Sequence, residues 1–271
     1  MCRVDSANTA HRLALGRITH KEYDYAKSNR RAWPHPGPGA LVSAAAFSAL
    51  LLTIIPWFWP LAYPLRLLTT LIHELGHGLA ALLTGGRFVR FVVFADGSGL
   101  AFTAGGWRWL IIPAGYIGVA LCATALIMLG RNVRSSHRTL LVLGAVIALC
   151  TLFFGVPTIF SAQMLAGLLT VFSGLLMGCL LVWAGLRAGQ ALAVYLVNLL
   201  AFYLGLSAFS DIATLVALST DGRPQQTDAE AMAQVTFLPA ALWAVAWGVL
   251  AALLLGSALW ATWVRPWLRG R

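Results

Sequence analysis

A histidine–glutamate–histidine motif stands out in a chain that has few charged residues. The segment His73-Glu74-Leu75-Gly76-His77 has the form H-E-x-x-H, and it lies within the apolar stretch 65–84. On a helix, side chains at i and i+4 project from one face, so the two histidines can share one Zn²⁺ ion. Glu74 follows His73 by about 100° around the helix and can act as a general base on water at that metal. The motif therefore predicts a catalytic zinc site with one Zn²⁺ per chain.

A catalytic zinc site normally needs a third protein ligand. Asp211 is the only acidic residue in the apolar stretches that follow the motif, and carboxylates inside a membrane are functional candidates because they are costly there. If each apolar stretch crosses the membrane once, the stretches 65–84 and 190–219 run in the same direction. Asp211 and the motif then lie at a similar depth below the same membrane surface. An ion pair with Arg66 or a hydrogen bond to Ser207 is the alternative role for Asp211. The predicted site comprises the metal ligands His73, His77 and Asp211 and the catalytic residue Glu74.

The composition defines the class of protein that must position these residues. Hydrophobic residues make up 59% of the 271 residues, and charged residues make up 10%, against roughly 25% in soluble domains. This excludes a soluble enzyme, a disordered chain and a disulfide-stapled secreted module. The net charge of +10 comes largely from a basic tail at 1–38 and a second at 265–271. Such clusters next to a membrane fix topology or contact anionic headgroups, and we expect no nucleic-acid partner.

We predict an all-α polytopic membrane protein, a bundle of six to seven transmembrane helices between the two tails, with the membrane domain at 39–264. The candidate spans, each close to the ~20 residues that a bilayer core requires, are 40–59, 65–84, 109–129, 139–155, 163–186, 190–219 and 237–264. Whether 40–59 spans the membrane or lies at its surface is left open. So is the side of the membrane on which each terminus lies.

One separator between the spans differs from the others. Residues 87–104 are rich in β-forming side chains and contain Asp96-Gly97, a dipeptide typical of hairpin turns. We therefore predict a small membrane-associated β-hairpin directly after the H-E-x-x-H helix. Its edges must be paired or covered, because lipid satisfies no backbone hydrogen bond.

The segment HELGHGLAALLTGG, the hairpin after it and the glycine-rich stretch GYIGVALCATALIMLG resemble the site-2 protease family of intramembrane zinc metallopeptidases. The similarity is greatest to the compact bacterial branch that lacks a PDZ domain. The resemblance implies a multi-pass protein of a bacterial cell membrane, with zinc buried in a helical bundle beside a hairpin that pairs with an extended substrate. It also implies that His73, His77 and Asp211 hold zinc and that Glu74 is the catalytic base.

The sequence thus predicts a zinc-dependent intramembrane endopeptidase that hydrolyses peptide bonds of transmembrane protein substrates. Phe91 and Val93, on an edge strand, are candidate substrate-binding residues by β-augmentation. Asn198 is a further candidate, with an interhelical hydrogen bond as its alternative role. Two other functions remain open: a non-proteolytic membrane scaffold or metal-binding regulator, and a proton-coupled transporter that uses Glu74 and Asp211.

Overall fold

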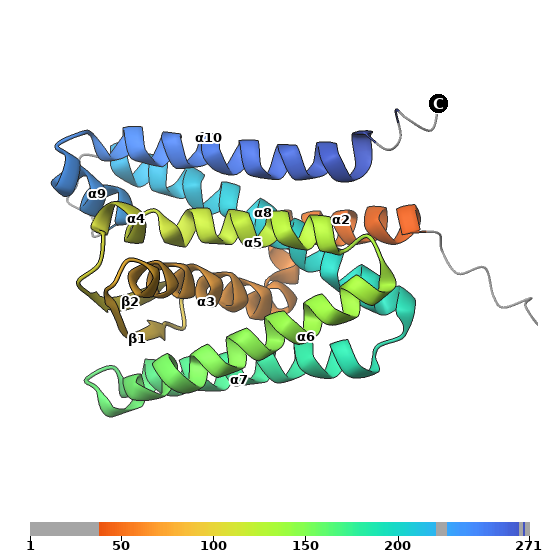
Figure 1. Cartoon of the computed structure of the whole chain (residues 1–271), viewed down its shortest axis with the longest axis horizontal. Coiled ribbons are helices and arrows are strands. Elements are labelled where there is room, and N and C mark those ends of the chain that lie inside the picture. The colour runs from red at the N-terminus through yellow and green to blue at the C-terminus, as the bar shows by residue number, and fades with distance from the viewer. Residues whose placement is uncertain (1–37, 221–226, 266–267, 269–271) are drawn as a thin grey trace, which may run out of the picture. The chain divides into compact units, whose positions relative to one another are not determined.

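The computed structural model describes residues 38–220, 227–265 and 268 and shows a helical bundle with one small sheet (Figure 1). The predicted tail 1–38 lies, up to residue 37, outside the described residues, and so does most of the tail 265–271. The long helices are α2 (Pro38–Ile54), α3 (Trp59–Leu83), α5 (Ala114–Leu129), α6 (Val133–Cys150), α7 (Met164–Arg187), α8 (Gln190–Thr220) and α10 (Ala240–Leu259). Two helices are short, α4 (Arg108–Ile111) and α9 (Asp228–Thr236).

Among the described residues, four helical segments are long and apolar enough to cross a membrane: Val133–Phe160, Met164–Arg187, Gln190–Thr220 and Ala240–Val264. The bent pair Gly39–Ile54 and Pro56–Leu83 makes a fifth if it is counted as one span. A helical membrane protein is thus confirmed, whereas the predicted count of six to seven spans is not. The count is lower because the first two predicted spans form this pair. In addition, α5 has 16 residues, fewer than the ~20 of a typical span.

The bend between α2 and α3 follows from the sequence Ile55-Pro56. Ile55 is extended, with φ −94° and ψ 111°, because a following proline disfavours the α conformation. Pro56 then begins a short 3₁₀ turn (Pro56–Phe58) that leads directly into α3. The two helices meet at 98°, so α2 packs along α8 while α3 turns toward α5 and the sheet (Figure 1).

The predicted hairpin is confirmed. Strand β1 (Arg87–Val93) pairs antiparallel with β2 (Gly99–Ala104) directly after α3. In the turn, the Asp96 carboxylate accepts hydrogen bonds from the Ser98 backbone N–H at 2.9 Å and the Ser98 hydroxyl at 2.7 Å. These bonds, the backbone one first, hold the pKa of Asp96 below its ordinary value. Gly97 has a φ of 85°, which suits glycine.

The two outer edges of the hairpin have different surroundings. On β1, the Phe91 carbonyl accepts a hydrogen bond from the Thr158 hydroxyl at 2.7 Å, and the Val93 N–H donates to the Thr170 hydroxyl at 2.8 Å. Thr158 lies in the connection between α6 and α7, and Thr170 lies in α7. Their side chains bond to backbone groups of this edge, as a sheet in an apolar bundle requires. Within the part of the chain that the structure describes, the other strand, β2, has no further strand beside it, and it lines a cavity next to α3.

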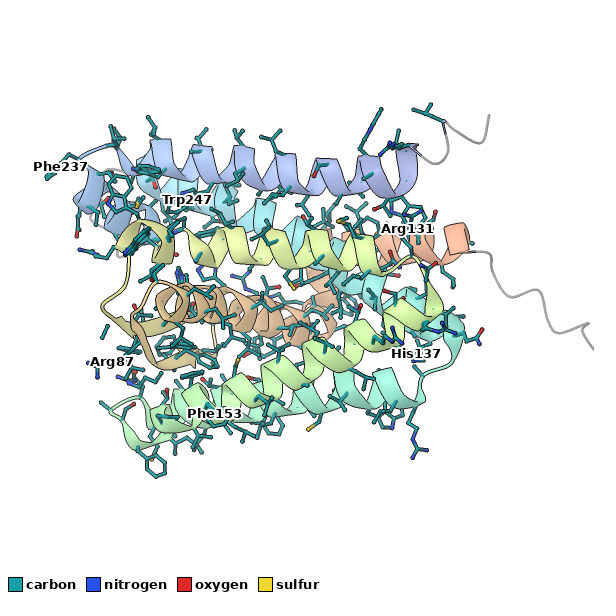
Figure 2. All side chains as sticks on the ribbon, viewed as in Figure 1. Arg87, Arg131, His137, Phe153, Phe237 and Trp247 are labelled. Carbon is teal, nitrogen blue, oxygen red and sulfur yellow. The ribbon has the colours of Figure 1, made fainter. Side chains whose placement is uncertain are left out.

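Of the described arginines, fewer lie at the hairpin end of the bundle, which carries Arg87, Arg90 and Arg108, than at the opposite end. The start of α2, the α5–α6 and α7–α8 connections and the end of α10 all lie at this end (Figure 1). The arginines of these segments in the described part of the chain are Arg131, Arg134, Arg138, Arg187 and Arg265. Figure 2 shows Arg131 at this end and Phe237 at the opposite one. The positive-inside rule predicts that the end with more arginines faces the cytoplasm.

We therefore expect the C-terminus to be cytoplasmic. In a Gram-negative host, green fluorescent protein fused after Arg271 should fluoresce. Alkaline phosphatase fused there should be inactive, because it needs an oxidising compartment for its disulfides. As a matched control, alkaline phosphatase inserted at Phe237, which is 93% exposed, should be active. The reverse pattern at the two positions would contradict this orientation.

Candidate metal centre

His73, Glu74 and His77 lie on the part of α3 that protein surrounds most closely. Glu74 is 4% exposed and His77 is 7% exposed. Two glycines bring α3 and the first turn of α5 together. A Cβ atom on Gly76 would overlap the Ala114 carbonyl, and a Cβ atom on Gly115 would overlap the Nε2 atoms of both histidines. Small residues at such a contact let helix backbones approach closely.

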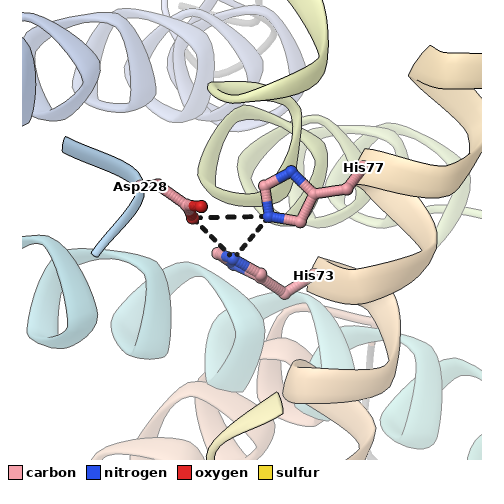
Figure 3. Close-up of side chains that lie close together, drawn as sticks. All are labelled: His73, His77 and Asp228. Atoms are coloured by element: carbon pink, nitrogen blue, oxygen red, sulfur yellow. Dashed lines mark hydrogen bonds and ion pairs between the residues drawn. The ribbon is translucent and has the colours of Figure 1, made fainter. Parts of the chain in front are cut away.

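The two histidines meet Asp228, the first residue of α9 (Figure 3). Nε2 of His73 lies 3.2 Å from Oδ2 of Asp228, Nε2 of His77 lies 3.3 Å from the same oxygen, and the two Nε2 atoms are 3.1 Å apart. Tetrahedral ligands at usual zinc–nitrogen and zinc–oxygen distances are about 3.3 Å from one another. The three atoms therefore have the mutual spacing of three ligands on one zinc ion.

The hydrogen bonds of this group favour a cation at its centre. Nδ1 of His77 bonds to the Ile111 carbonyl at 2.7 Å, so Nδ1 carries the proton in neutral imidazole and Nε2 presents a lone pair. Asp228 is only partly buried, with 27% of its side chain exposed, and its Oδ2 atom faces both Nε2 atoms. An ionised carboxylate and imidazole lone pairs facing one another form a donor set suited to zinc.

Glu74 stands beside this group and faces the sheet. Gly99 of β2 packs directly on it, since a Cβ atom on Gly99 would come within 2.5 Å of Oε1 of Glu74. Glu74 and the three members of the metal group line a cavity of about 460 Å³. The polar lining of this cavity continues to Arg66 and Asp211. The arrangement places a carboxylate next to a candidate metal centre in a space that can hold water and a peptide segment.

A family model described as Peptidase M50B-like matches residues 43–258, most of the chain. The chain belongs to this family. The resemblance to the site-2 protease family is thereby confirmed, and this M50B-like chain is a member of a family of membrane peptidases. No curated protein and no solved structure matches the chain.

In this M50B-like chain, Asp211 does not lie in the three-residue metal group. Its Oδ1 atom lies 3.4 Å from Nη1 of Arg66, the ion pair considered as its alternative role. Asp211 lines the same cavity as His73, Glu74 and His77. Arg66, however, precedes His73 by two helical turns, about 10 Å along α3. Asp211 therefore meets α3 at a different turn from the one that carries the histidines.

Asp228 is not among the site residues predicted from the sequence. It lies in a polar segment between two apolar stretches, and such a segment is typical of a loop that connects two spans. One signal was available there. The segment Thr227-Asp228-Ala229-Glu230 fits the capping-box pattern, which marks the start of a helix. In the structure, Thr227 is the N-cap of α9, and its hydroxyl accepts a hydrogen bond from the Glu230 N–H at 3.2 Å. This short helix begins against α3 and brings the Asp228 carboxylate back to the histidines.

The three candidate substrate-binding residues lie away from the cavity lining. Phe91 and Val93 are fully buried in β1, and threonine hydroxyls already occupy backbone groups of both. Asn198 is 1% exposed, and its amide donates to the Gly130 carbonyl at 3.0 Å and the Val194 carbonyl at 2.8 Å. Its interhelical hydrogen bond joins α8 to the end of α5, which was the alternative role considered for Asn198.

The geometry predicts different effects of the two aspartates on metal binding. Asp228→Ala should lower zinc affinity by more than about 100-fold, since loss of even an outer partner of a ligand costs 10- to 100-fold. Asp211→Ala should leave zinc content unchanged because it breaks only a half-exposed ion pair. Metal analysis of the purified proteins after dialysis against a zinc buffer measures both. Loss of zinc in Asp211→Ala with retention in Asp228→Ala would contradict the geometry.

Gly115 offers a second test, on the helix opposite the histidines. Gly115→Ala should abolish zinc binding, because the new methyl group would overlap both Nε2 atoms. Gly118→Ala is the matched control one turn along α5, where a Cβ atom meets Gly76 at 3.4 Å, an ordinary contact. Zinc content is compared between variants that keep the thermal unfolding midpoint of the metal-free protein. A folded Gly115→Ala protein with wild-type zinc content would argue against this site.

Proposed function

We propose that this M50B-like protein is a zinc-dependent intramembrane endopeptidase that acts on membrane-embedded protein substrates. The observation that carries the proposal is the convergence of three ligand atoms, 3.1 to 3.3 Å apart, beside the buried carboxylate of Glu74. Two histidines and one carboxylate are a ligand set found in zinc peptidases. The family match supports a peptidase in general, and the donor set supports its metal.

In this proposal His73, His77 and Asp228 hold the zinc ion. Bound zinc supplies Lewis acidity, which polarises a carbonyl and lowers the pKa of water. The Ile111 carbonyl orients His77 by accepting the hydrogen bond from its Nδ1, as outer partners of metal-bound histidines commonly do. Asp228 replaces Asp211 as the third ligand, and Asp211 remains a lining residue paired with Arg66.

Glu74 is the proposed general base. Its carboxylate is buried at the cavity, one residue from His73 on the helix, where it can accept a proton from the attacking water. It can then deliver that proton to the departing amine nitrogen. The cleaved peptide bond gains the elements of water, so one carboxylate that first accepts and then donates a proton suffices for the reaction.

The outer edge of β2, which faces away from β1, is the proposed binding site for the substrate backbone. In the β1–β2 register, Phe91 faces Ala101 and Val93 faces Gly99. Since threonines bind the outward groups of Phe91 and Val93, the backbone groups of Ala101 and Gly99 point away from β1 in the same way. This edge of β2 lines the cavity with Glu74. An unwound substrate segment can therefore add to β2, rather than to β1, by β-augmentation.

We expect Glu74→Gln to reduce cleavage by about 10²- to 10⁴-fold, the usual contribution of a general base, while zinc content stays at the wild-type value. The assay uses purified protein and a single-span model substrate with a fluorescent tag at each end and a helix-destabilising segment in its span. Cleavage is followed by gel fluorescence. Glu74→Ala, which also lacks the carboxylate, should match Glu74→Gln.

Three outcomes separate the candidate functions. Zinc-loaded wild-type protein that does not cleave the single-span model substrate would favour the non-proteolytic scaffold or regulator. Solute flux that is insensitive to chelators but lost in Glu74→Gln would favour the transporter. Cleavage by Glu74→Gln at the wild-type rate would refute the proposed role of Glu74.

A further inference from the structure

One aromatic residue of the cavity has a polar group that the roles described so far do not use. Tyr116 follows Gly115 in the first turn of α5 and lines the same cavity as His73, Glu74 and Asp228. Gly115 brings this turn into contact with both histidines. The next residue therefore carries a phenol to the rim of the metal group.

Packing holds the Tyr116 ring from two sides. The ring meets that of His73 edge to face, with centroids 4.6 Å apart and an interplanar angle of 89°. On another side it stacks with Trp247 of α10 at 5.8 Å, and Trp247 is buried at 4% exposure. A ring fixed in this way presents its hydroxyl in one direction and loses little entropy when that hydroxyl forms a hydrogen bond.

Tyr116 lines the cavity together with three carboxylate residues, Asp228, Asp211 and Glu74. Its ring contacts that of His73, so the phenol belongs to the part of the cavity wall that carries the metal group. Among the described residues, no hydrogen bond from the Tyr116 hydroxyl to another side chain or carbonyl is present. A phenol O–H is a hydrogen-bond donor, so this group is available to a ligand in the cavity.

Neighbouring hydroxyls of the cavity already have partners. Thr70, one turn before Glu74, donates to the Gly97 carbonyl at 2.7 Å. Thr227, next to Asp228, accepts the Glu230 N–H that caps α9. Arg66 is engaged by Asp211. Tyr116 thus combines a fixed ring, a free donor and a position beside the metal group.

We propose that Tyr116 is a catalytic residue whose phenolic O–H donates a hydrogen bond to the oxyanion that forms when water attacks the scissile carbonyl. The proposal rests on the proposed peptidase function. The phenol keeps its proton throughout, and the proton of the attacking water passes through Glu74. Donors aimed at the oxyanion are worth more than those aimed at the ground-state carbonyl, because charge develops on that oxygen during the reaction.

Tyr116→Phe tests this role because it removes the hydroxyl and keeps the ring that packs on His73. We expect kcat to fall by about 100-fold, the usual cost of losing one oxyanion donor, with KM and zinc content close to wild type. Tyr195→Phe is the matched control. Its hydroxyl donates to Ser48 between α8 and α2, outside the cavity lining, and its removal should leave kcat unchanged.

A binding measurement on zinc-loaded protein gives a readout that does not depend on turnover. The probe is a peptide phosphonamidate, whose tetrahedral anionic phosphorus group resembles the intermediate, and the reference is the same peptide with an ordinary amide. Tyr116→Phe should bind the phosphonamidate about 100-fold more weakly than wild type and the amide equally well. Titration calorimetry of wild type, Tyr116→Phe and Tyr195→Phe measures the phosphonamidate, and the Glu74→Gln forms of the same three proteins, which do not cleave the amide, measure the amide.

The outcomes separate this proposal from the proposed function. If wild type cleaves and Glu74→Gln does not, but Tyr116→Phe retains kcat and phosphonamidate affinity, the role of Tyr116 is refuted while the peptidase stands. If Tyr116→Phe loses zinc, its hydroxyl acts on the metal group itself, and the oxyanion role is likewise refuted. If wild type neither cleaves substrate nor prefers the phosphonamidate over the amide, the proposed function fails and the role of Tyr116 falls with it.

Discussion

The mutual repulsion of three lone-pair atoms in an apolar bundle is the constraint on which the rest of the site depends. His73, His77 and Asp228 bring two imidazole nitrogens and a carboxylate oxygen to within 3.3 Å of one another. Without a proton or a cation between them, such atoms repel one another, and a partly buried site screens this repulsion less than bulk water does. The surrounding elements must therefore hold each ligand in place. Two ligands lie on one helix, the third begins another, and the Ile111 carbonyl fixes the orientation of His77.

Glycines make this convergence possible because they let α5 and β2 approach α3 closely. Gly76 and Gly115 form the contact between α3 and α5, and Gly99 brings β2 against Glu74. A glycine inside a helix or strand is destabilising by roughly 0.5–1 kcal/mol relative to alanine. Here each glycine permits a contact that a methyl group would block. The glycines next to the motif are thus part of the site, although they contribute no functional group to it.

The sequence predicted the features that depend on local pattern. The H-E-x-x-H helix and the hairpin with its Asp96-Gly97 turn follow from spacing and turn chemistry, and both are present. Hydropathy indicated a membrane protein, but its six to seven spans are not confirmed, because it does not distinguish two spans from two helices joined at 98° at Ile55-Pro56. Asp211 was predicted as a ligand from its depth, but hydropathy does not specify the turn of α3 that a side chain on α8 meets. Asp228 lies beyond the last residue of α8, where composition indicates only a polar connection.

The hairpin shows how an apolar environment constrains recognition as well as folding. Backbone groups in a bilayer must be hydrogen-bonded, so the outer edge of β1 is bonded to Thr158 and Thr170. If the edge of β2 were satisfied in the same way, no place would remain for an extended substrate. A transmembrane substrate faces the same constraint, because a segment that unwinds for cleavage exposes its own N–H and C=O groups. The outer edge of β2, which lines the cavity with Glu74, can satisfy those groups where the peptide bond must be presented. The outer edge of β1 is bonded to threonines, whereas the outer edge of β2 faces the cavity. A substrate segment that unwinds would therefore bind along β2, next to the candidate metal centre.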